Sequence, residues 1–364
     1  MDETLILLGA TALAALLCVV LTPAARFVGL IDHPSPNKPH EGEVPLVGGI
    51  AVLLAVAAVV PLLLPLGSVS PWLVGGAVAM LLTGAFDDAI ELGPRLRLLL
   101  QVGVCTVAAV YGQMLISDFG KLLSEQTLAL GSLAVPITVF AVVGLINAFN
   151  MVDGMDGLAG SVFVVAAGAM AICGVAAGQP SGMIAAVLAS AVSGFLLLNA
   201  RFPWNQRARV FMGDSGSMLL GFLLGWFTVV LSQGEGRAFA PVTAIWLCAV
   251  PLLDTGSLII RRIGSGHGPL NRDLHHLHHL FLRAGFSVTQ TWLIIVALTA
   301  LLAAVGLVGE FSGVPEHWRF YGFLVVTVAY HLSVVRLWRQ GRVFGREILD
   351  MEAIRAIRAR QSVS

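Results

Sequence analysis

Residues 147–160 read Asn-Ala-Phe-Asn-Met-Val-Asp-Gly-Met-Asp-Gly-Leu-Ala-Gly, an unusually polar stretch between two apolar runs. Two amides and two carboxylates follow one another at steps of three residues: Asn147, Asn150, Asp153 and Asp156. This spacing places them on neighbouring positions of a helical or tight turn, where their oxygens can converge on a cation or a polyphosphate. A solvated loop also contains Asn, Asp and Gly. The regular spacing and similar clusters elsewhere favour a ligand site.

A second cluster is the adjacent pair Asp87 and Asp88 at the end of another apolar run. Neighbouring carboxylates at a membrane boundary repel each other, so a cation, a shared proton or a basic partner must compensate them. Arg95 and Arg97 are near enough in sequence to be a purely structural partner. The pair therefore has a functional and a structural interpretation.

A third cluster is Gly-Asp-Ser-Gly-Ser at residues 213–217, where Asp214 opens an apolar run. The free N–H groups and the dipole at a helix start favour an anionic ligand, while the carboxylate can hold that ligand's metal ion. Capping of the helix by Asp214 is the simpler alternative, and it is compatible with ligand binding.

The fourth cluster contains four histidines, His275, His276, His278 and His279. Their spacing would gather the imidazoles on a helix, and zinc binding is one interpretation. The other clusters are rich in oxygen, which suits Mg²⁺ or Mn²⁺. We therefore favour histidines that face a diphosphate, protonated or as hydrogen-bonding groups.

Two further residues have ambiguous roles. Lys38, in a proline-rich polar segment, either binds phosphate or anchors a helix end on the positive-inside face. Asp254 lies within an apolar run, where an ionisable residue suggests function, but pairing with Arg261 or Arg262 is an equal alternative.

The composition determines the class of protein. With 57% hydrophobic and 12% charged residues and a mean hydropathy of +0.89, the chain is too apolar for a soluble protein. We predict an all-α, polytopic membrane protein with about eleven transmembrane helices and no nucleic-acid partner. The expected runs are 4–23, 47–66, 71–86, 96–115, 134–149, 158–177, 181–199, 214–232, 239–260, 291–309 and 318–338.

The charge distribution predicts the topology. If the odd-numbered loops are cytoplasmic, they and the C-terminal tail hold every Lys and Arg except Lys121, Arg237 and Arg319. The N-terminus is then outside and the C-terminus inside. We expect residues 1–338 to form the catalytic membrane domain and residues 339–364 a basic amphipathic tail on the inner face.

All the polar clusters fall in odd-numbered loops, so they share one face and can form a single cytoplasmic site. Carboxylates, amides, basic residues and a Mg²⁺ ion at a membrane surface are typical of phosphoryl transfer. An ion or solute transporter is the competing class, but its site usually lies near the midplane between internal repeats, and we find no such repeat.

The clusters together resemble the polyprenyl-phosphate N-acetylhexosamine-1-phosphate transferases. The resemblance spans roughly residues 32–290 and rests on Asp87-Asp88, Asn147-x-x-Asn150-x-x-Asp153-Gly-x-Asp156-Gly, Gly213-Asp214-x-Gly216-Ser217 and His275-His276-Leu277-His278-His279. Leu277 interrupts the histidines, whereas the branch that uses UDP-MurNAc-pentapeptide has three in a row. The chain is more similar to the branch that makes undecaprenyl-diphospho-N-acetylglucosamine.

The resemblance implies transfer of N-acetylglucosamine 1-phosphate from UDP-N-acetylglucosamine to undecaprenyl phosphate in the bacterial inner membrane, an early step of cell-surface polysaccharide synthesis such as O-antigen. Another UDP-N-acetylhexosamine is the alternative donor, and a homodimer is compatible with the sequence. The implied cofactor is Mg²⁺, with Mn²⁺ as a substitute.

The resemblance also implies roles for individual residues. Asp214 and Asn150 would hold the metal, and Asp87 and Asp88 would orient or deprotonate the lipid phosphate. Contacts to the donor are expected from Phe211, which would stack on uracil, from Asp153 and Asp156 near the uridine, and from His275, His276, His278 and His279 on the diphosphate. Lys38, Asn147 and Arg272 complete the expected substrate-binding set.

Overall fold

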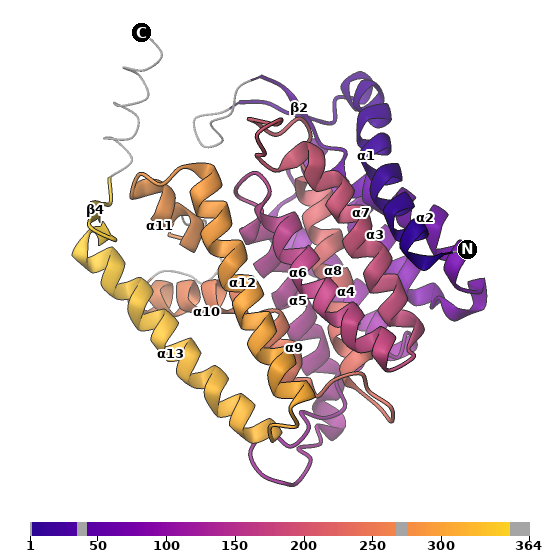
Figure 1. Ribbon diagram of the computed structural model, residues 1–364, viewed down its shortest axis with the longest axis vertical. Helices are drawn as coiled ribbons and strands as arrows, with labels where there is room; N and C mark the ends of the chain where they lie inside the picture. Colours follow the sequence, from indigo (N-terminus) through magenta and orange to yellow (C-terminus); the bar gives the residue numbers. More distant parts are fainter. Residues whose placement is uncertain (1, 35–41, 267–274, 350–364) are drawn as a thin grey trace.

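The computed structural model describes residues 2–34, 42–266 and 275–349 (Figure 1). Lys38 and Arg272 lie outside these residues, so their expected roles stay predictions. The described helices are α1 (Glu3–Val28), α2 (Gly48–Leu63), α3 (Pro71–Ile90), α4 (Pro94–Tyr111), α5 (Ala134–Val152), α6 (Leu158–Ala176), α7 (Pro180–Asn199), α8 (Gly213–Ser232), α9 (Pro241–Leu247), α10 (Ala249–Gly264), α11 (Leu277–Arg283), α12 (Val288–Phe311) and α13 (Glu316–Gln340).

Two small antiparallel hairpins accompany the helices. Strand β1 (Ile31–Asp32) pairs with β2 (Val44–Pro45), and β3 (Arg342–Val343) pairs with β4 (Arg346–Glu347). Figure 1 shows β2 and α11 at the upper end of the bundle, whereas the segment between α4 and α5 lies at the lower end.

The predicted all-α membrane class is confirmed. Within the described residues, nine helices are long and apolar enough to cross a bilayer. Helices α9 and α10 together are also long and apolar enough, as one bent span. Helix α2 is apolar but shorter, at 16 residues. The nine helices, the bent pair and α2 correspond to the eleven predicted runs.

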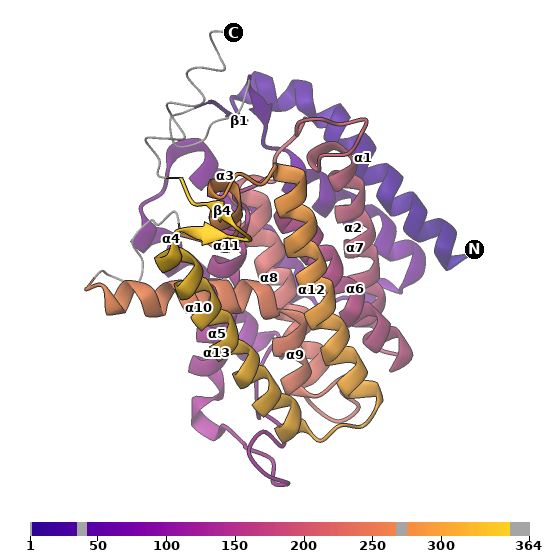
Figure 2. The same cartoon turned by 60° about the vertical axis from the view of Figure 1, so that its left-hand side comes forward.

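The prediction of one continuous helix over 239–260 was wrong. The run is broken at Cys248, and α9 and α10 meet at a bend of 80°. Pro251 explains the break, because it has no N–H to donate to the carbonyl of Leu247 and its ring would clash with that carbonyl. Figure 2 shows the result, with α10 running across the bundle while α12 and α13 run along it.

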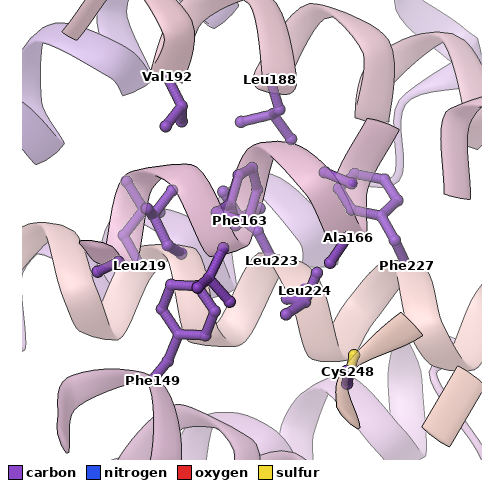
Figure 3. Close-up of a cluster of buried hydrophobic side chains, with 14 of the residues drawn as sticks. Phe149, Phe163, Ala166, Leu188, Val192, Leu219, Leu223, Leu224, Phe227 and Cys248 are labelled. Atoms are coloured by element: carbon purple, nitrogen blue, oxygen red, sulfur yellow. The ribbon is translucent and has the colours of Figure 1, made fainter. Parts of the chain in front are cut away.

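Helix α8 forms the centre of the bundle. It packs against α2, α3, α5, α6, α7 and α9. In its most apolar 18-residue stretch, 89% of the residues are buried, compared with 11% in the corresponding stretch of α13 at the periphery. Figure 3 shows its inner face, where Leu219, Leu223 and Phe227 meet side chains of α5, α6 and α7. Within this core, Phe149 and Phe163 make an edge-to-face contact with ring centroids 6.2 Å apart.

The start of α8 is approached closely by two neighbouring helices. A methyl group added at Gly84 of α3 would lie 2.3 Å from the backbone oxygen of Asp214, and one added at Gly49 of α2 would lie 2.5 Å from the Cα of Gly216. Only glycine permits backbones to come this near to each other. These glycines therefore bring α2 and α3 directly onto the polar start of α8.

We expect Gly84→Ala to lower the thermal stability of the detergent-solubilised protein, because the added methyl must push α3 away from α8. Overpacking of this kind costs about 1–3 kcal/mol. The matched control is Gly75→Ala on the same helix, where an added methyl meets no atom within 4 Å. Equal unfolding temperatures of the two variants would contradict the close packing of α3 on α8.

Candidate active site at the start of helix α8

Asp88 connects α3 to the first turn of α8. Its carboxylate oxygens accept hydrogen bonds from the backbone N–H groups of Asp214 at 2.8 Å and Ser215 at 3.0 Å. The first N–H groups of a helix have no partner inside the helix, and the dipole there stabilises a negative charge. Gly213 has φ +70, and an added Cβ would lie 2.6 Å from an Asp88 oxygen, so the contact requires glycine. Asp88, rather than Asp214, occupies the capping position.

Asn150 approaches the same turn from the end of α5. Its amide donates to the Asp214 carboxylate and, at 2.9 Å, to the hydroxyl of Ser217. Asp214 and Ser217 are three residues apart on α8 and therefore share one helix face. The structure thus brings together Asp88, Asn150 and Asp214, which lie at the ends of three different helices, α3, α5 and α8.

These three side chains form an oxygen-rich donor set. Across the residues the structure describes, no three His, Cys, Asp or Glu side chains gather as a complete metal site. Mg²⁺ commonly takes only one or two protein carboxylates and fills its other positions with water and substrate phosphate oxygens. Asp214, Asp88 and the Asn150 amide fit this coordination, and Mn²⁺ uses the same kinds of ligand.

Asp87 points away from this group. Its carboxylate accepts a hydrogen bond from Arg97 of α4 at 2.8 Å and is buried. The structural alternative for the acidic pair therefore applies to Asp87, because Arg97 compensates its charge. Asp88 alone of the two reaches α8.

Three members of the regularly spaced set between residues 147 and 156 have different partners. Asn147 donates to Gln101 at 2.7 Å and to its own helix, and Asp156 accepts from Arg201 at 2.8 Å. The reason is that α5 ends at Val152, so the periodicity of the helix does not continue to Asp153 and Asp156. Asn150, by contrast, contacts Asp214 and Ser217 at the start of α8.

Phe211 is held by its backbone beside loop one. Its N–H donates to the carbonyl of Pro45 at 2.9 Å, and its carbonyl accepts from Gly48 at 3.0 Å. This pairing joins the segment before α8 to strand β2 and the start of α2. The expected stacking of Phe211 on uracil stays a prediction.

Three of the four histidines form a cluster on α11 and the residue before it. The ring centroids of His278 and His279 are 4.1 Å apart, and His276 stacks on His278 at 5.8 Å with an interplanar angle of 6°. A methyl group added at Gly154 would lie 2.5 Å from Nε2 of His278, so the cluster adjoins the loop after α5. His275 instead meets the ring of Trp338 on α13.

The environment keeps two of these rings uncharged. Burial, followed by repulsion from His279 and His276, holds the pKa of His278 well below its ordinary value. Burial and then His276 lower the pKa of His279 to about 4. Both rings are neutral at physiological pH and can act there as hydrogen-bonding groups but not as cations.

Two contacts at the site involve partners that the sequence analysis had not assigned. Ser217 supports Asn150, and Arg201 pairs with Asp156. Ser217 could have been found, because it lies one helical turn after Asp214. Arg97 was named as a possible partner of the acidic pair, and the structure shows it on Asp87. Asp254 was also named, but its contact with His276 joins segments that no spacing rule connects.

The C-terminal hairpin packs against the histidine helix. Leu349 and Arg283 exchange two hydrogen bonds of 2.9 Å, and Arg346 donates to the carbonyl of Gly285 at 3.0 Å. The Arg346 guanidinium also lies 4.3 Å from the ring centre of Phe286. Residues 342–349 thus brace α11, and the predicted domain boundary at residue 339 stays untested.

We expect the lowered pKa values to make stability depend on pH. The unfolded chain binds protons at these histidines below about pH 6.5, whereas folded His279 binds its proton only near pH 4. Stability should therefore fall as pH drops from about 6.5 toward 4. The slope of unfolding temperature against pH in this window should be smaller in His279→Gln than in wild type. Identical slopes would contradict a neutral, buried His279.

Truncation tests the bracing role of the hairpin. A chain ending at Gln340 should lose most of its catalytic activity yet still insert in the membrane, because α11 loses its support from Leu349 and Arg346. The control chain ends at Leu349 and keeps both contacts. If both truncated chains have equal turnover, the hairpin does not position α11.

Comparison with known proteins agrees with this geometry. Residues 70–232, from α3 to α8, match the profile of glycosyl transferase family 4. The chain is 36% identical over 332 residues to the undecaprenyl-phosphate α-N-acetylglucosaminyl 1-phosphate transferase of Escherichia coli K12, covering 88% of both chains. It is similar to enzymes of the same name from Yersinia pestis, at 35% identity and 88% coverage of both, and Haemophilus influenzae, at 36% identity, with 90% of this chain and 92% of the relative covered. The chain therefore belongs to the polyprenyl-phosphate N-acetylhexosamine-1-phosphate transferases of glycosyl transferase family 4, as its motifs predicted.

Proposed function

We propose that this protein transfers N-acetylglucosamine 1-phosphate from UDP-N-acetylglucosamine to undecaprenyl phosphate, releasing UMP, on the cytoplasmic face of the bacterial inner membrane. The observation that carries the proposal is the group of Asp88, Asp214 and Asn150 at the start of α8. It is supported by relatives of this name that match over most of the chain.

In this reaction an oxygen of the lipid phosphate attacks the β-phosphorus of the UDP-sugar. One phosphoanhydride bond forms as another breaks, and UMP leaves with the electron pair of the broken bond. A bound Mg²⁺ would neutralise the charge on the phosphate oxygens. Asp214 and Asn150 are the residues proposed to hold it.

The chain's own residues position the reactants. Asp88 is fixed by two backbone N–H groups of α8, so it can orient a lipid phosphate next to Asp214 without moving. His278 and His279 are neutral, and His278 lies next to Gly154, so both rings are suited to hydrogen-bond the diphosphate. Such positioning and charge compensation supply most of the catalysis in phosphoryl transfer.

The direct experiment supplies purified protein with undecaprenyl phosphate, Mg²⁺ and a panel of UDP-sugars, and measures lipid product. The proposal predicts product with UDP-N-acetylglucosamine and none after EDTA treatment. Preferential turnover of another UDP-N-acetylhexosamine would change the proposed donor sugar but leave the proposed reaction in place. Absence of product from every UDP-sugar would overturn the proposed reaction.

We expect Asp214→Asn to lower turnover by roughly 100-fold or more, because it removes a charge that the phosphoryl-transfer site uses directly. Inserted protein and its unfolding temperature should be close to wild type. Asp118→Asn is the control, because Asp118 lies in the segment between α4 and α5 at the other end of the bundle. Near wild-type activity of Asp214→Asn in saturating Mg²⁺ would exclude Asp214 as a ligand.

The proposed orientation is tested by single cysteines. Ser265→Cys, after α10, should react with a membrane-impermeant thiol reagent only when the cytoplasmic side is accessible. Ser124→Cys should react in cells whose outer membrane is permeable and whose inner membrane is intact. Both positions are exposed, and the four native cysteines are buried, so their background labelling should be low. Labelling of Ser265→Cys in such cells would contradict a cytoplasmic site.

A further inference from the structure

Asp254 of α10 is a buried carboxylate with a complete set of partners. One oxygen lies 2.8 Å from Nδ1 of His276, and the other accepts from the backbone N–H of Leu277 and the hydroxyl of Tyr330, each at 3.0 Å. The residue is only 4% exposed. A carboxylate so far from water is stable only if donors satisfy its oxygens, and here three donors from two other segments do so.

The contact determines which nitrogen of His276 carries hydrogen. An ionised carboxylate can only accept, so Nδ1 of His276 must be the donor, and Nε2 is the nitrogen that can bind another group. The other Asp254 oxygen is occupied by two donors, the Leu277 N–H and the Tyr330 hydroxyl.

Asp254 also fixes where the histidine helix begins. Leu277 is the first residue of α11, and its N–H is one of the donors that a helix cannot satisfy internally. His276 stacks in parallel on His278, whose ring adjoins Gly154. A displacement at Asp254 would therefore move His276 and His278 together relative to the loop after α5.

The described polar groups that contact the pair or its neighbours come from α10, α11 and α13. His278 and His279 face His276 from α11, and Tyr330 reaches Asp254 from α13. Arg261 on α10 donates to the carbonyl of His275 at 2.8 Å. Among these groups Asp254 is the anion that contacts His276, so the dyad is a defined unit.

We propose that Asp254 is a positioning residue for the transfer reaction. It holds His276 with Nδ1 protonated and Nε2 directed to the diphosphate of the donor, and Tyr330 supports Asp254 from α13. This inference rests on the proposed function. It assigns a role to a carboxylate that lies outside the four sequence clusters.

The test is a double-mutant cycle on Asp254→Asn and His276→Gln in the purified, full-length protein. Asp254→Asn keeps the size of the side chain but no longer requires hydrogen on Nδ1. We expect kcat to fall about 10- to 100-fold, the loss typical of groups that orient a functional side chain, with KM for UDP-N-acetylglucosamine within about twofold of wild type. In the His276→Gln background, Asp254→Asn should cause no further loss, because it acts through His276.

A purely structural role predicts a different pattern. The losses in kcat would then multiply, and the unfolding temperature would fall in parallel. Glu310→Gln is the matched control, because Glu310 also accepts hydrogen bonds from three donors, Ala240, Thr243 and Arg319, but does so near the end of α12 away from α11. It should change stability without the selective loss of kcat.

Tyr330→Phe provides a second, milder variant that removes one hydrogen bond to Asp254. It should lower kcat a few-fold, again without further effect in His276→Gln. Unchanged kcat in Asp254→Asn, or multiplicative losses in either cycle, would overturn the positioning role while wild-type protein remains active. Inactive wild-type protein would instead refute the proposed function on which the inference rests.

Discussion

The site depends on one contact, in which the Asp88 carboxylate accepts the free N–H groups at the start of α8. A helix start needs acceptors for these groups, and a partly buried carboxylate such as Asp88 needs donors, so each satisfies the other across two helices. Gly84 and Gly213 allow the approach, because any side chain at either position would meet the backbone or the carboxylate. The contact fixes Asp214 next to Asn150 and so defines where a metal-bound phosphate would lie.

The histidine side of the site is supported by elements that are distant in sequence from α8. Helix α11 carries the clustered histidines but has only seven residues, too few for a stable isolated helix. Asp254 of α10 supports its first turn, and the hairpin β3–β4 supports its last residues. The bend between α9 and α10 directs α10 across the bundle (Figure 2), and Asp254 on α10 contacts the first residue of α11.

The sequence predicted the class, the helical segments and the polar clusters, because apolar run length and isolated polar residues report directly on burial in lipid. It offered Arg97 as a partner of the acidic pair but did not predict which of the two aspartates it meets, nor most of the other pairings. Asp87 and Asp88 are adjacent, yet successive residues point about 100° apart around a helix, so one meets Arg97 and the other α8. The steps of three from Asn147 to Asp156 assume a helix that α5 does not continue beyond Val152, and Asn147 and Asp156 contact Gln101 and Arg201 instead of each other. The break at Pro251 had a signal in the sequence, whereas the Asp254–His276 pair had none.

The proposed reaction exchanges one phosphoanhydride for another with no external energy source. The most direct measurement supplies the detergent-solubilised protein with labelled UMP, unlabelled UDP-N-acetylglucosamine, undecaprenyl phosphate and Mg²⁺, and follows label in the UDP-sugar. Bonds of the same type are broken and formed, so the equilibrium constant should lie within about one or two decades of unity. We expect label to enter the UDP-sugar, EDTA to stop the exchange, and Asp88→Asn to lack it. Absence of metal-dependent exchange in a folded preparation of the wild-type protein would refute the proposed reaction.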